Sequence, residues 1–217
     1  MKRFLPEIPF YSVHLKRETI REPFMTHLQN SLGRTIETWE ASEGKEVAAR
    51  GWPRKHPFEP ETSIGALGCL DSHIRLLTHM TSQNFPVMGI FEDDAEFVGT
   101  IPNLDSFYNT VNAFEPEWDI LFLGANEWVE YEQVESSLVK VSRFWGTHAF
   151  LIRESAARKV IQDHEDLLAK GYAYPADWLY AYSIQRHKLK TFGPIYSKRF
   201  IRQKPGLVSA INGKMRT

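Results

Sequence analysis

Apolar residues recur along the chain in two alternating patterns. Short continuous runs predict buried strands, and repeats at every third or fourth position predict helices with one buried face. The strands expected are residues 10–15, 35–39, 86–91, 118–123 and 147–152. The helices expected are residues 17–32, ended by Gly33, one that follows a Ser63 cap, 103–114 with Asn103 as cap, 155–170, and 175–186. Residues 43–62 are rich in Gly, Pro and charge, which predicts a surface loop.

Strands that alternate with helices indicate the fold class. They predict an α/β domain with a mostly parallel central sheet flanked by helices. A length of 217 residues fits a single domain over residues 1–217. In such sheets, ligands bind at the carboxyl ends of the strands.

Composition restricts the class of protein. Hydrophobic residues make up 42% and charged residues 24%, as in ordinary globular chains. The single cysteine, Cys69, can form no internal disulfide. No apolar run approaches the ~18 residues of a membrane span, and the first ten residues do not resemble a signal peptide. We therefore expect a cytoplasmic protein without a membrane span.

Charge is distributed unevenly along the chain. Residues 1–177 carry 17 basic and 27 acidic groups, a net of −10, whereas the last 40 residues carry nine basic groups and none that are acidic. The basic segment 186–217 suits a phosphorylated ligand or an anionic surface, including peripheral contact with the inner face of a membrane. Alternatively, it docks on the acidic body of the same domain.

An acidic cluster follows the apolar run 86–91. Glu92, Asp93 and Asp94 stand at the predicted carboxyl end of a buried strand. Strand alternation predicts that Glu92 and Asp94 point to one side and Asp93 to the other. Oxygen ligands in this position suit Mg²⁺ or Mn²⁺. The alternative is a solvated acidic turn.

Several segments resemble glycosyltransferase family 25, which includes lipooligosaccharide and procollagen galactosyltransferases. Residues 13–17 resemble its opening strand, residues 39–44 its x-x-A-x-x-G segment, and residues 64–73 its most specific stretch, GxxGCxxSH. Residues 90–97 contain its EDD signature, and residues 118–124 and 146–152 resemble two further strands. The six segments occur in the family's order over nearly the whole chain.

The resemblance implies a GT-A-type nucleotide-binding domain that is a metal-dependent, inverting hexosyltransferase. It implies a UDP-galactose or UDP-glucose donor, a saccharide, lipid-linked glycan or glycoprotein acceptor, as in lipopolysaccharide biosynthesis, and Mn²⁺ (or Mg²⁺) as cofactor. The expected metal ligands are Asp94, Glu92 and Asp93. The residues expected to contact the nucleotide sugar are Arg17, Ser42, Ser72, His73 and His148. For His73 and His148, a structural role inside the protein is the alternative.

Sugar transfer also requires a neutralised diphosphate and a base for the acceptor hydroxyl. Arg202 and Lys204 are candidates for binding the diphosphate, because phosphate oxygens favour basic donors. The alternative is that both are solvated surface charges. The basic segment that contains them would then pack on or close over the donor site. Asp177, at a predicted helix start after Pro175, is the candidate base or else a helix cap, and Glu127 is a weaker candidate base.

Two aromatic residues are candidates for stacking on the acceptor sugar. Trp128 and Tyr131 are expected in a polar loop that follows a strand end.

Two other functions fit the acidic cluster less well. One is a metal-dependent phosphoryl-transfer or hydrolytic enzyme, although the chain has no G-x-x-x-x-G-K-[ST] loop. The other is a catalytically inactive, transferase-like binding domain, although such a domain has no need of the acidic cluster. Nucleic-acid binding is disfavoured because the body of the chain is acidic and its basic residues form no aromatic-interleaved module.

Overall fold

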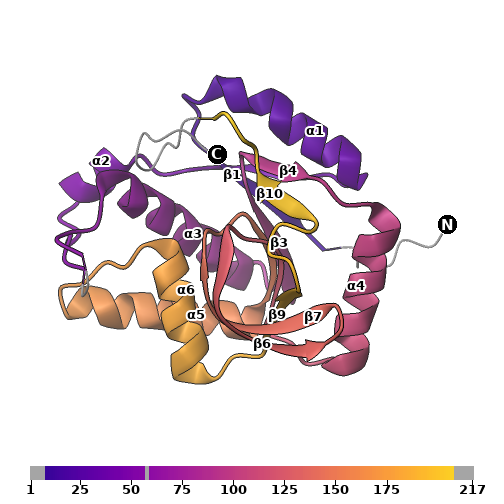
Figure 1. Ribbon diagram of the computed structural model, residues 1–217. Helices are drawn as coiled ribbons and strands as arrows, with labels where there is room; N and C mark the ends of the chain where they lie inside the picture. The colour runs from indigo at the N-terminus through magenta and orange to yellow at the C-terminus, as the bar shows by residue number, and fades with distance from the viewer. Residues whose placement is uncertain (1–7, 57–58, 208–217) are drawn as a thin grey trace.

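The computed structural model describes residues 8–56 and 59–207 (Figure 1). Its strands are β1 (Phe10–His14), β2 (Glu37–Glu40), β3 (Val87–Glu92), β4 (Ala95–Phe97), β5 (Ile120–Gly124), β6 (Glu127–Glu135), β7 (Leu138–Trp145), β8 (Ala149–Arg153), β9 (Thr191–Pro194) and β10 (Ile201–Gln203). Its helices are the 3-10 turn η1 (Thr19–Arg21), α1 (Glu22–Leu32), α2 (Gly44–Ala49), α3 (Ile64–Ser82), α4 (Ile101–Phe114), α5 (Glu154–Ala169) and α6 (Ala176–His187).

Eight strands form one central sheet in the order β2-β1-β3-β8-β5-β9-β7-β6. β1 pairs in parallel with β2 and β3, and β5 pairs in parallel with β9. Only β7 and β8 run against their neighbours, so six of the eight strands point in the same direction. The predicted α/β class with a mostly parallel sheet is therefore confirmed. The carboxyl ends of β1 and β3 lie side by side, and the acidic segment follows there.

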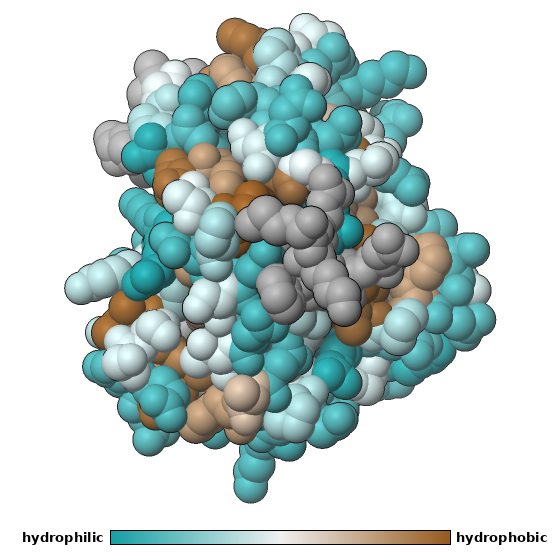
Figure 2. Space-filling view, turned by 90° about the vertical axis from the view of Figure 1, so that its right-hand side faces the viewer, coloured by the Kyte–Doolittle hydropathy of each residue, from teal (hydrophilic) through white to brown (hydrophobic). Residues whose placement is uncertain are grey.

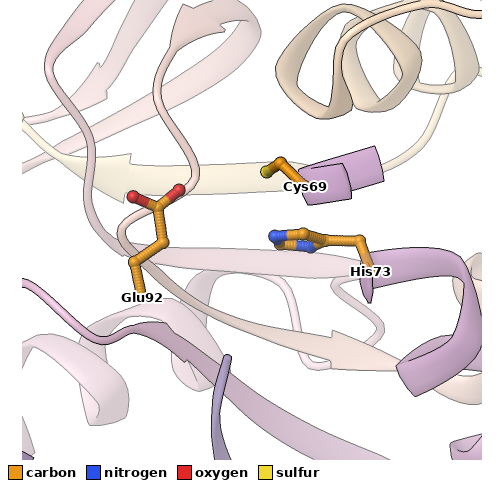
Figure 3. Close-up of side chains that lie close together, drawn as sticks. All are labelled: Cys69, His73 and Glu92. Carbon is orange, nitrogen blue, oxygen red and sulfur yellow. The ribbon is translucent and has the colours of Figure 1, made fainter. Parts of the chain in front are cut away.

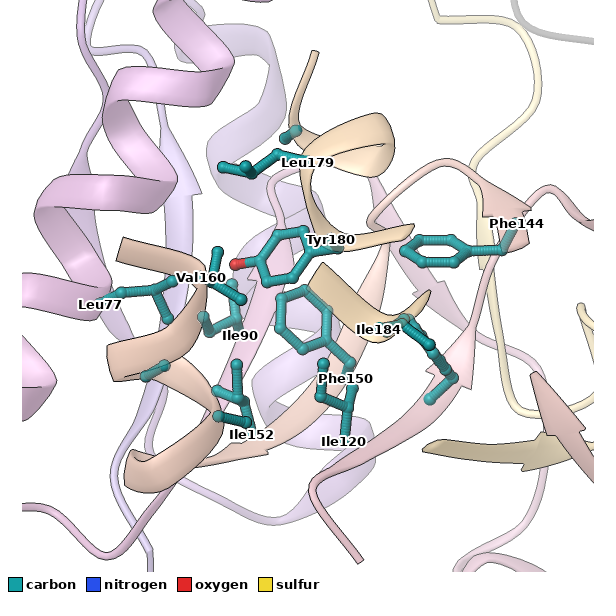
Figure 4. Packing of buried hydrophobic residues seen from close by; sticks show 14 of the residues in the cluster. Leu77, Ile90, Ile120, Phe144, Phe150, Ile152, Val160, Leu179, Tyr180 and Ile184 are labelled. Atoms are coloured by element: carbon teal, nitrogen blue, oxygen red, sulfur yellow. The ribbon is translucent and has the colours of Figure 1, made fainter. Parts of the chain in front are cut away.

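Alternation along the central strands divides the core into two layers. On β5, Ile120 and Phe122 face the layer that contains α3, α5 and α6, whereas Leu121 and Leu123 face the layer that contains α1 and α4. Phe150 of β8 packs edge-to-face on Tyr180 of α6, with ring centroids 5.1 Å apart (Figure 4). These fully buried side chains fix the position of α6 over the sheet.

Helix α3 begins where the sequence predicts. The Ser63 hydroxyl accepts a hydrogen bond from the Ala66 backbone N–H at 3.2 Å, the geometry of an N-cap. Leu67, Leu70 and Leu77 are buried on one face of the helix, as their spacing indicates. The helix thereby presents Cys69 and His73 to the carboxyl end of β3.

The C-terminal strand β10 forms a second, two-stranded sheet with β4, directly after the acidic segment. It passes close over β5, because a Cβ atom added at Gly124 would lie 2.1 Å from the Ile201 carbonyl oxygen. Only glycine permits this approach. Part of the basic segment, up to residue 207, therefore packs against the acidic end of the sheet, while residues 208–217 lie outside the described residues.

Three local expectations were wrong. Residues 43–62 contain helix α2, whose Val47 is buried under α3. The helix expected over 17–32 begins only at Glu22, because Pro23 lacks an N–H and is tolerated in a first turn but not in a helix interior. Helix α4 is capped by Thr100, whose hydroxyl accepts from the Asn103 N–H at 3.4 Å, and Asn103 is inside the helix.

A long hairpin, β6–β7, occupies residues that had no strand assignment. Most residues of β6 are exposed, because it is the edge strand of the sheet. A mainly charged edge strand carries little apolar alternation, and so its sequence does not resemble a strand.

The position of the α4 cap can be tested by mutagenesis. Thr100→Ala removes the capping oxygen and should lower the free energy of unfolding by about 1 kcal/mol. Asn103→Ala, at an exposed helix position, should change it by less than about 0.5 kcal/mol. Urea unfolding of both variants measures the difference, and a larger loss in Asn103→Ala would contradict the assignment.

Candidate functional site

Two cavities open at the carboxyl ends of the strands. The first encloses about 630 Å³ between β1, the acidic segment, the start of α2 and the first half of α3. Its walls include Arg17, Ser42, Ser72, His73 and all three residues of the acidic cluster. The second encloses about 1010 Å³ between the start of α3, the β7–β8 connection and the start of α6. Its walls include His56, Asn126, Trp145, Asp177, Trp178 and Gln203.

Two residues, Cys69 and Glu92, line both cavities. The cavities are therefore neighbours that share a wall. A molecule bound in the first cavity can therefore approach a molecule bound in the second cavity near Glu92.

The acidic cluster is neutralised from inside the protein. Arg21 Nη1 is hydrogen-bonded to Asp93 Oδ1 and lies 3.5 Å from Asp94 Oδ2, and His14 Nδ1 lies 2.8 Å from Asp93 Oδ2. All four side chains are buried. Burial lowers the pKa of Arg21, but the two carboxylates more than compensate, so its pKa is raised and it stays charged.

The expected alternation of the three carboxylates was wrong. Asp93 and Asp94 both face Arg21, whereas Glu92 points toward Thr147 in the β7–β8 connection. The reason is that β3 ends at Glu92 and the next two residues form a turn, where the period of two no longer holds.

Glu92 is held by side chains from two other segments. Thr147 Oγ1 donates a hydrogen bond to it at 2.6 Å, Gln203 Nε2 donates at 3.2 Å, and His148 Nδ1 lies 3.6 Å from Oε2. Burial raises the pKa of Glu92, but the interactions with His148 and Thr147 outweigh it and hold that pKa well below its usual range. Glu92 is therefore ionised at neutral pH.

His148 lies behind this carboxylate. Its side chain is fully buried, and its Nε2 lies 3.0 Å from Asn126 Oδ1. It is absent from the walls of both cavities. His148 can therefore orient Glu92, but it does not itself reach a molecule bound in either cavity.

Arg17 and Ser42 lie on the wall of the first cavity. Arg17 is half-exposed and paired with Glu43. The Ser42 hydroxyl donates a hydrogen bond to the Asp71 carboxylate. The Ser42 backbone N–H donates to Ser72 Oγ at 2.8 Å. Ser72 is fully buried and donates to the Gly68 carbonyl at 2.6 Å, so it fastens the loop before α2 to α3.

His73 is buried beneath the first cavity. Its Nδ1 lies 3.2 Å from the Tyr180 hydroxyl, and burial lowers its pKa to about 4. The ring is therefore neutral at pH 7, so one of its nitrogens carries a lone pair.

Arg202 and Lys204 lie beside the acidic segment, but their side chains pair with Glu96, each at 2.8 Å. The Lys204 backbone N–H donates to the Asp94 carbonyl at 2.8 Å. Arg186 and Lys190 also pair with carboxylates of the body, at 2.8 Å and 3.2 Å. In the described part of the basic segment, these four side chains therefore dock on the acidic body of the same domain.

Asp177 lies on the wall of the second cavity. Its Oδ2 accepts from the Gly146 N–H at 3.2 Å and its Oδ1 from the Trp178 N–H at 3.0 Å. The N-cap of α6 is Pro175, so Asp177 is not the cap. Burial raises the pKa of Asp177, and the two backbone N–H groups only partly oppose it.

Glu127, the weaker candidate for the base, is exposed at the start of β6. It is absent from the walls of both cavities.

The expected loop position of Trp128 and Tyr131 was wrong, since both lie in strand β6. Trp128 is buried in the core, packs on Phe122 and donates its Nε1–H to the Pro194 carbonyl at 2.9 Å. Tyr131 is 56% exposed on the edge strand. Neither residue is on the wall of a cavity.

The aromatic residues of the second cavity are instead Trp145 and Trp178, with ring centroids 5.4 Å apart. The Arg143 guanidinium lies over both rings, at 5.3 Å and 4.7 Å. The sequence did not predict this pair, although Trp145 directly precedes the segment 146–152 and Trp178 directly follows Asp177.

No helix within residues 8–56 and 59–207 is both long and apolar enough to cross a membrane. On the face shown in Figure 2, hydrophobic residues form small groups separated by hydrophilic ones.

Comparison with solved structures finds weak similarities. A glycosyltransferase involved in the glycosylation of the major capsid of PBCV-1 is 14% identical, with 87% of this chain and 81% of that chain covered and a TM-score of 0.44. A mutant Drosophila β-1,4-galactosyltransferase 7 in complex with manganese, UDP-Gal and xylobiose is 10% identical, with 95% and 73% covered and a TM-score of 0.45. At these TM-scores, neither similarity carries a conclusion about activity.

Comparison with sequence families is decisive. No curated protein matches the chain. The family described as glycosyltransferase family 25 (LPS biosynthesis protein) matches residues 7–179, which is most of the sequence. The matched range includes Arg17, the acidic cluster and Asp177. The chain therefore belongs to glycosyltransferase family 25 and is a glycosyltransferase.

Proposed function

We propose that this enzyme transfers a hexose, galactose or glucose, from a UDP-sugar to a saccharide or glycan acceptor with inversion, in the presence of Mn²⁺ or Mg²⁺. One observation carries the proposal. Two cavities share the wall at Glu92, one lined by the acidic cluster and the other by a partly buried carboxylate, Asp177. A reaction between two bound sugars needs this arrangement, with the donor in one cavity and the acceptor in the next.

The first cavity is the proposed donor site. Asp94 and Glu92 fit a divalent cation, since both are carboxylates on its wall and Glu92 is ionised. Asp93 fits less well, because the cationic Arg21 already compensates its charge, whereas Thr147 and Gln203, which donate to Glu92, are neutral. When bound, the cation would supply Lewis-acid stabilisation of the leaving UDP. Arg17 and Ser42 stand on the same wall and offer polar contacts to the nucleotide.

The basic side chains play a smaller part in this proposal. Arg202 and Lys204 are already paired with Glu96, and Ser72, His73 and His148 are engaged in contacts within the protein. We assign these five residues to positioning the wall of the donor site. The segment around β10 contributes Gln203, which reaches Glu92.

Asp177 is the proposed base. The acceptor hydroxyl oxygen bonds to the anomeric carbon as the bond from that carbon to UDP breaks, and the hydroxyl proton passes to Asp177. Two backbone N–H groups orient the carboxylate, and its raised pKa makes it a better proton acceptor than an exposed aspartate. Trp145 and Trp178 on the same cavity wall offer apolar ring surface to the acceptor sugar.

Cytoplasmic location and contact with a membrane surface remain part of the proposal. Lys198 and Arg199, in the turn before β10, are the basic residues best placed for an anionic surface, because both are exposed.

Metal dependence can be tested at Asp94. Asp94→Asn keeps the size of the side chain but removes its charge, and it should weaken Mn²⁺-dependent UDP binding by at least about tenfold. Calorimetric titration of UDP with and without Mn²⁺ measures this. The matched control is Glu132→Gln, which removes an exposed carboxylate of strand β6 outside both cavities and should retain binding. Equal UDP affinity in Asp94→Asn and the unaltered enzyme would exclude Asp94 as a ligand.

The base can be tested at Asp177. Asp177→Asn keeps one of the two accepting oxygens, for either the Gly146 or the Trp178 N–H group, but cannot take a proton. Its kcat should fall by at least about a hundredfold, the lower end for loss of a general base, while UDP-sugar binding stays within twofold of normal, about 0.4 kcal/mol. Glu127→Gln is the comparison and should keep normal turnover. The reverse result, a slow Glu127→Gln and a normal Asp177→Asn, would transfer the role to Glu127.

A further inference from the structure

Two chemically reactive side chains, Cys69 and His73, are neither ligands nor catalytic groups in this mechanism, and they lie beside Glu92. Cys69 and His73 lie four residues apart on α3, so they share a face of the helix. Glu92 approaches them from the end of β3, and Figure 3 shows the three side chains turned toward one another. One potential ligand atom from each residue lies within 4.8 Å of the other two.

His73 is held in a fixed orientation. The Nδ1 contact with the Tyr180 hydroxyl holds one edge of the ring, and Phe150 lies nearly parallel to its face at 6.1 Å between centroids. Its Nε2 atom is buried and has no hydrogen-bond partner in the part of the chain that the structure describes. In the tautomer that donates Nδ1–H to the Tyr180 hydroxyl, this buried Nε2 carries the lone pair of the ring. Leaving such a buried nitrogen unsatisfied is costly, so it calls for a partner.

Glu92 is equally constrained. The hydrogen bonds from Thr147 and Gln203 hold its carboxylate at the wall that the two cavities share. Metal sites are typically built in this way, with outer contacts that orient each ligand before the ion binds.

We propose that Cys69, His73 and Glu92 form a binding site for a thiophilic divalent cation of the Zn²⁺ class. A thiolate, an imidazole nitrogen and a carboxylate are the ligand types of zinc, and three protein ligands leave a fourth position open. Zinc bonds of about 2.0–2.3 Å require the three atoms to move only slightly closer together. The sulfur ligand separates this site from the donor site, because Mg²⁺ and Mn²⁺ prefer oxygen ligands.

The position of the site has a consequence for ligands. Both Cys69 and Glu92 line both cavities, so the open coordination position faces their shared wall. On binding, the Cys69 thiol loses its proton to solvent as the metal–sulfur bond forms. The site shares Glu92 with the proposed donor-cation site and to that extent rests on the same wall, but only this site uses Cys69 and His73 as ligands, so variants of these two residues test it separately from the proposed function.

Cobalt(II) is a suitable probe, because a cobalt–thiolate bond produces an ultraviolet charge-transfer absorption. Cys69 is the sole cysteine of the sequence, so any such band must come from it. Titration of the reduced, full-length protein should produce the band with a 1:1 end point, and Zn²⁺ should abolish it by displacement. Cys69→Ser should lack the band. His73→Gln should weaken cobalt binding by at least about tenfold.

Two controls separate this proposal from the previous one. Asp94→Asn, which should lose Mn²⁺-dependent UDP binding, should keep the cobalt band at full intensity. Circular dichroism checks that each variant is folded. The absence of a band in the unaltered protein would overturn the proposal without the need for any variant. An undiminished cobalt affinity in a folded His73→Gln would overturn it as well.

Discussion

Three adjacent carboxylates at the end of a buried strand can coexist only if their charge is compensated. Arg21 provides the compensation, with one guanidinium facing both Asp93 and Asp94, and His14 completes the contacts of Asp93. Removal of one partner from a buried ion pair typically costs about 3–5 kcal/mol, because the remaining charge stays uncompensated. The turn after β3, and with it the shape of the first cavity, therefore depends on a residue 72 positions earlier in the chain.

The three carboxylates of the acidic cluster differ in the side chains that compensate or orient them. Asp93 is bound by Arg21 and His14, whereas Glu92 is held by the β7–β8 connection and by β10 at the wall between the cavities. A run of identical charges thus becomes three side chains with different environments. The surroundings also separate Asp177 from Glu92. Burial raises the pKa of Asp177, whereas hydrogen bonds and nearby charge lower the pKa of Glu92.

Local patterns predicted most of the fold. Continuous apolar runs located β3, β5 and β8, and the Ser63 cap located the start of α3, because each signal lies within a few neighbouring residues. The acidic cluster was located at a strand end for the same reason. The β6–β7 hairpin escaped detection because an exposed edge strand lacks an apolar face. Trp128 was misplaced with it, since nothing near it in sequence shows that its partner is the Pro194 carbonyl.

Pairings between distant segments could not be predicted in this way. The contact of Arg21 with Asp93, of Gly146 with Asp177, and of Gln203 with Glu92 joins residues 31 to 111 positions apart. No periodicity specifies such contacts, because they arise only when the sheet has assembled. The functional residues were therefore easier to predict than the partners that determine their charge and orientation.

Strand β10 sets the order in which the enzyme can be completed. Protein synthesis proceeds from the N-terminus, so every strand of the eight-stranded sheet leaves the ribosome before residues 201–203 do. Until then, β4 has no strand partner, Glu92 lacks Gln203, and Asp94 lacks the Lys204 N–H. Because β10 pairs with β4 and with no strand of the eight-stranded sheet, undocking of this one short strand would remove these contacts and leave the ladder of the central sheet intact.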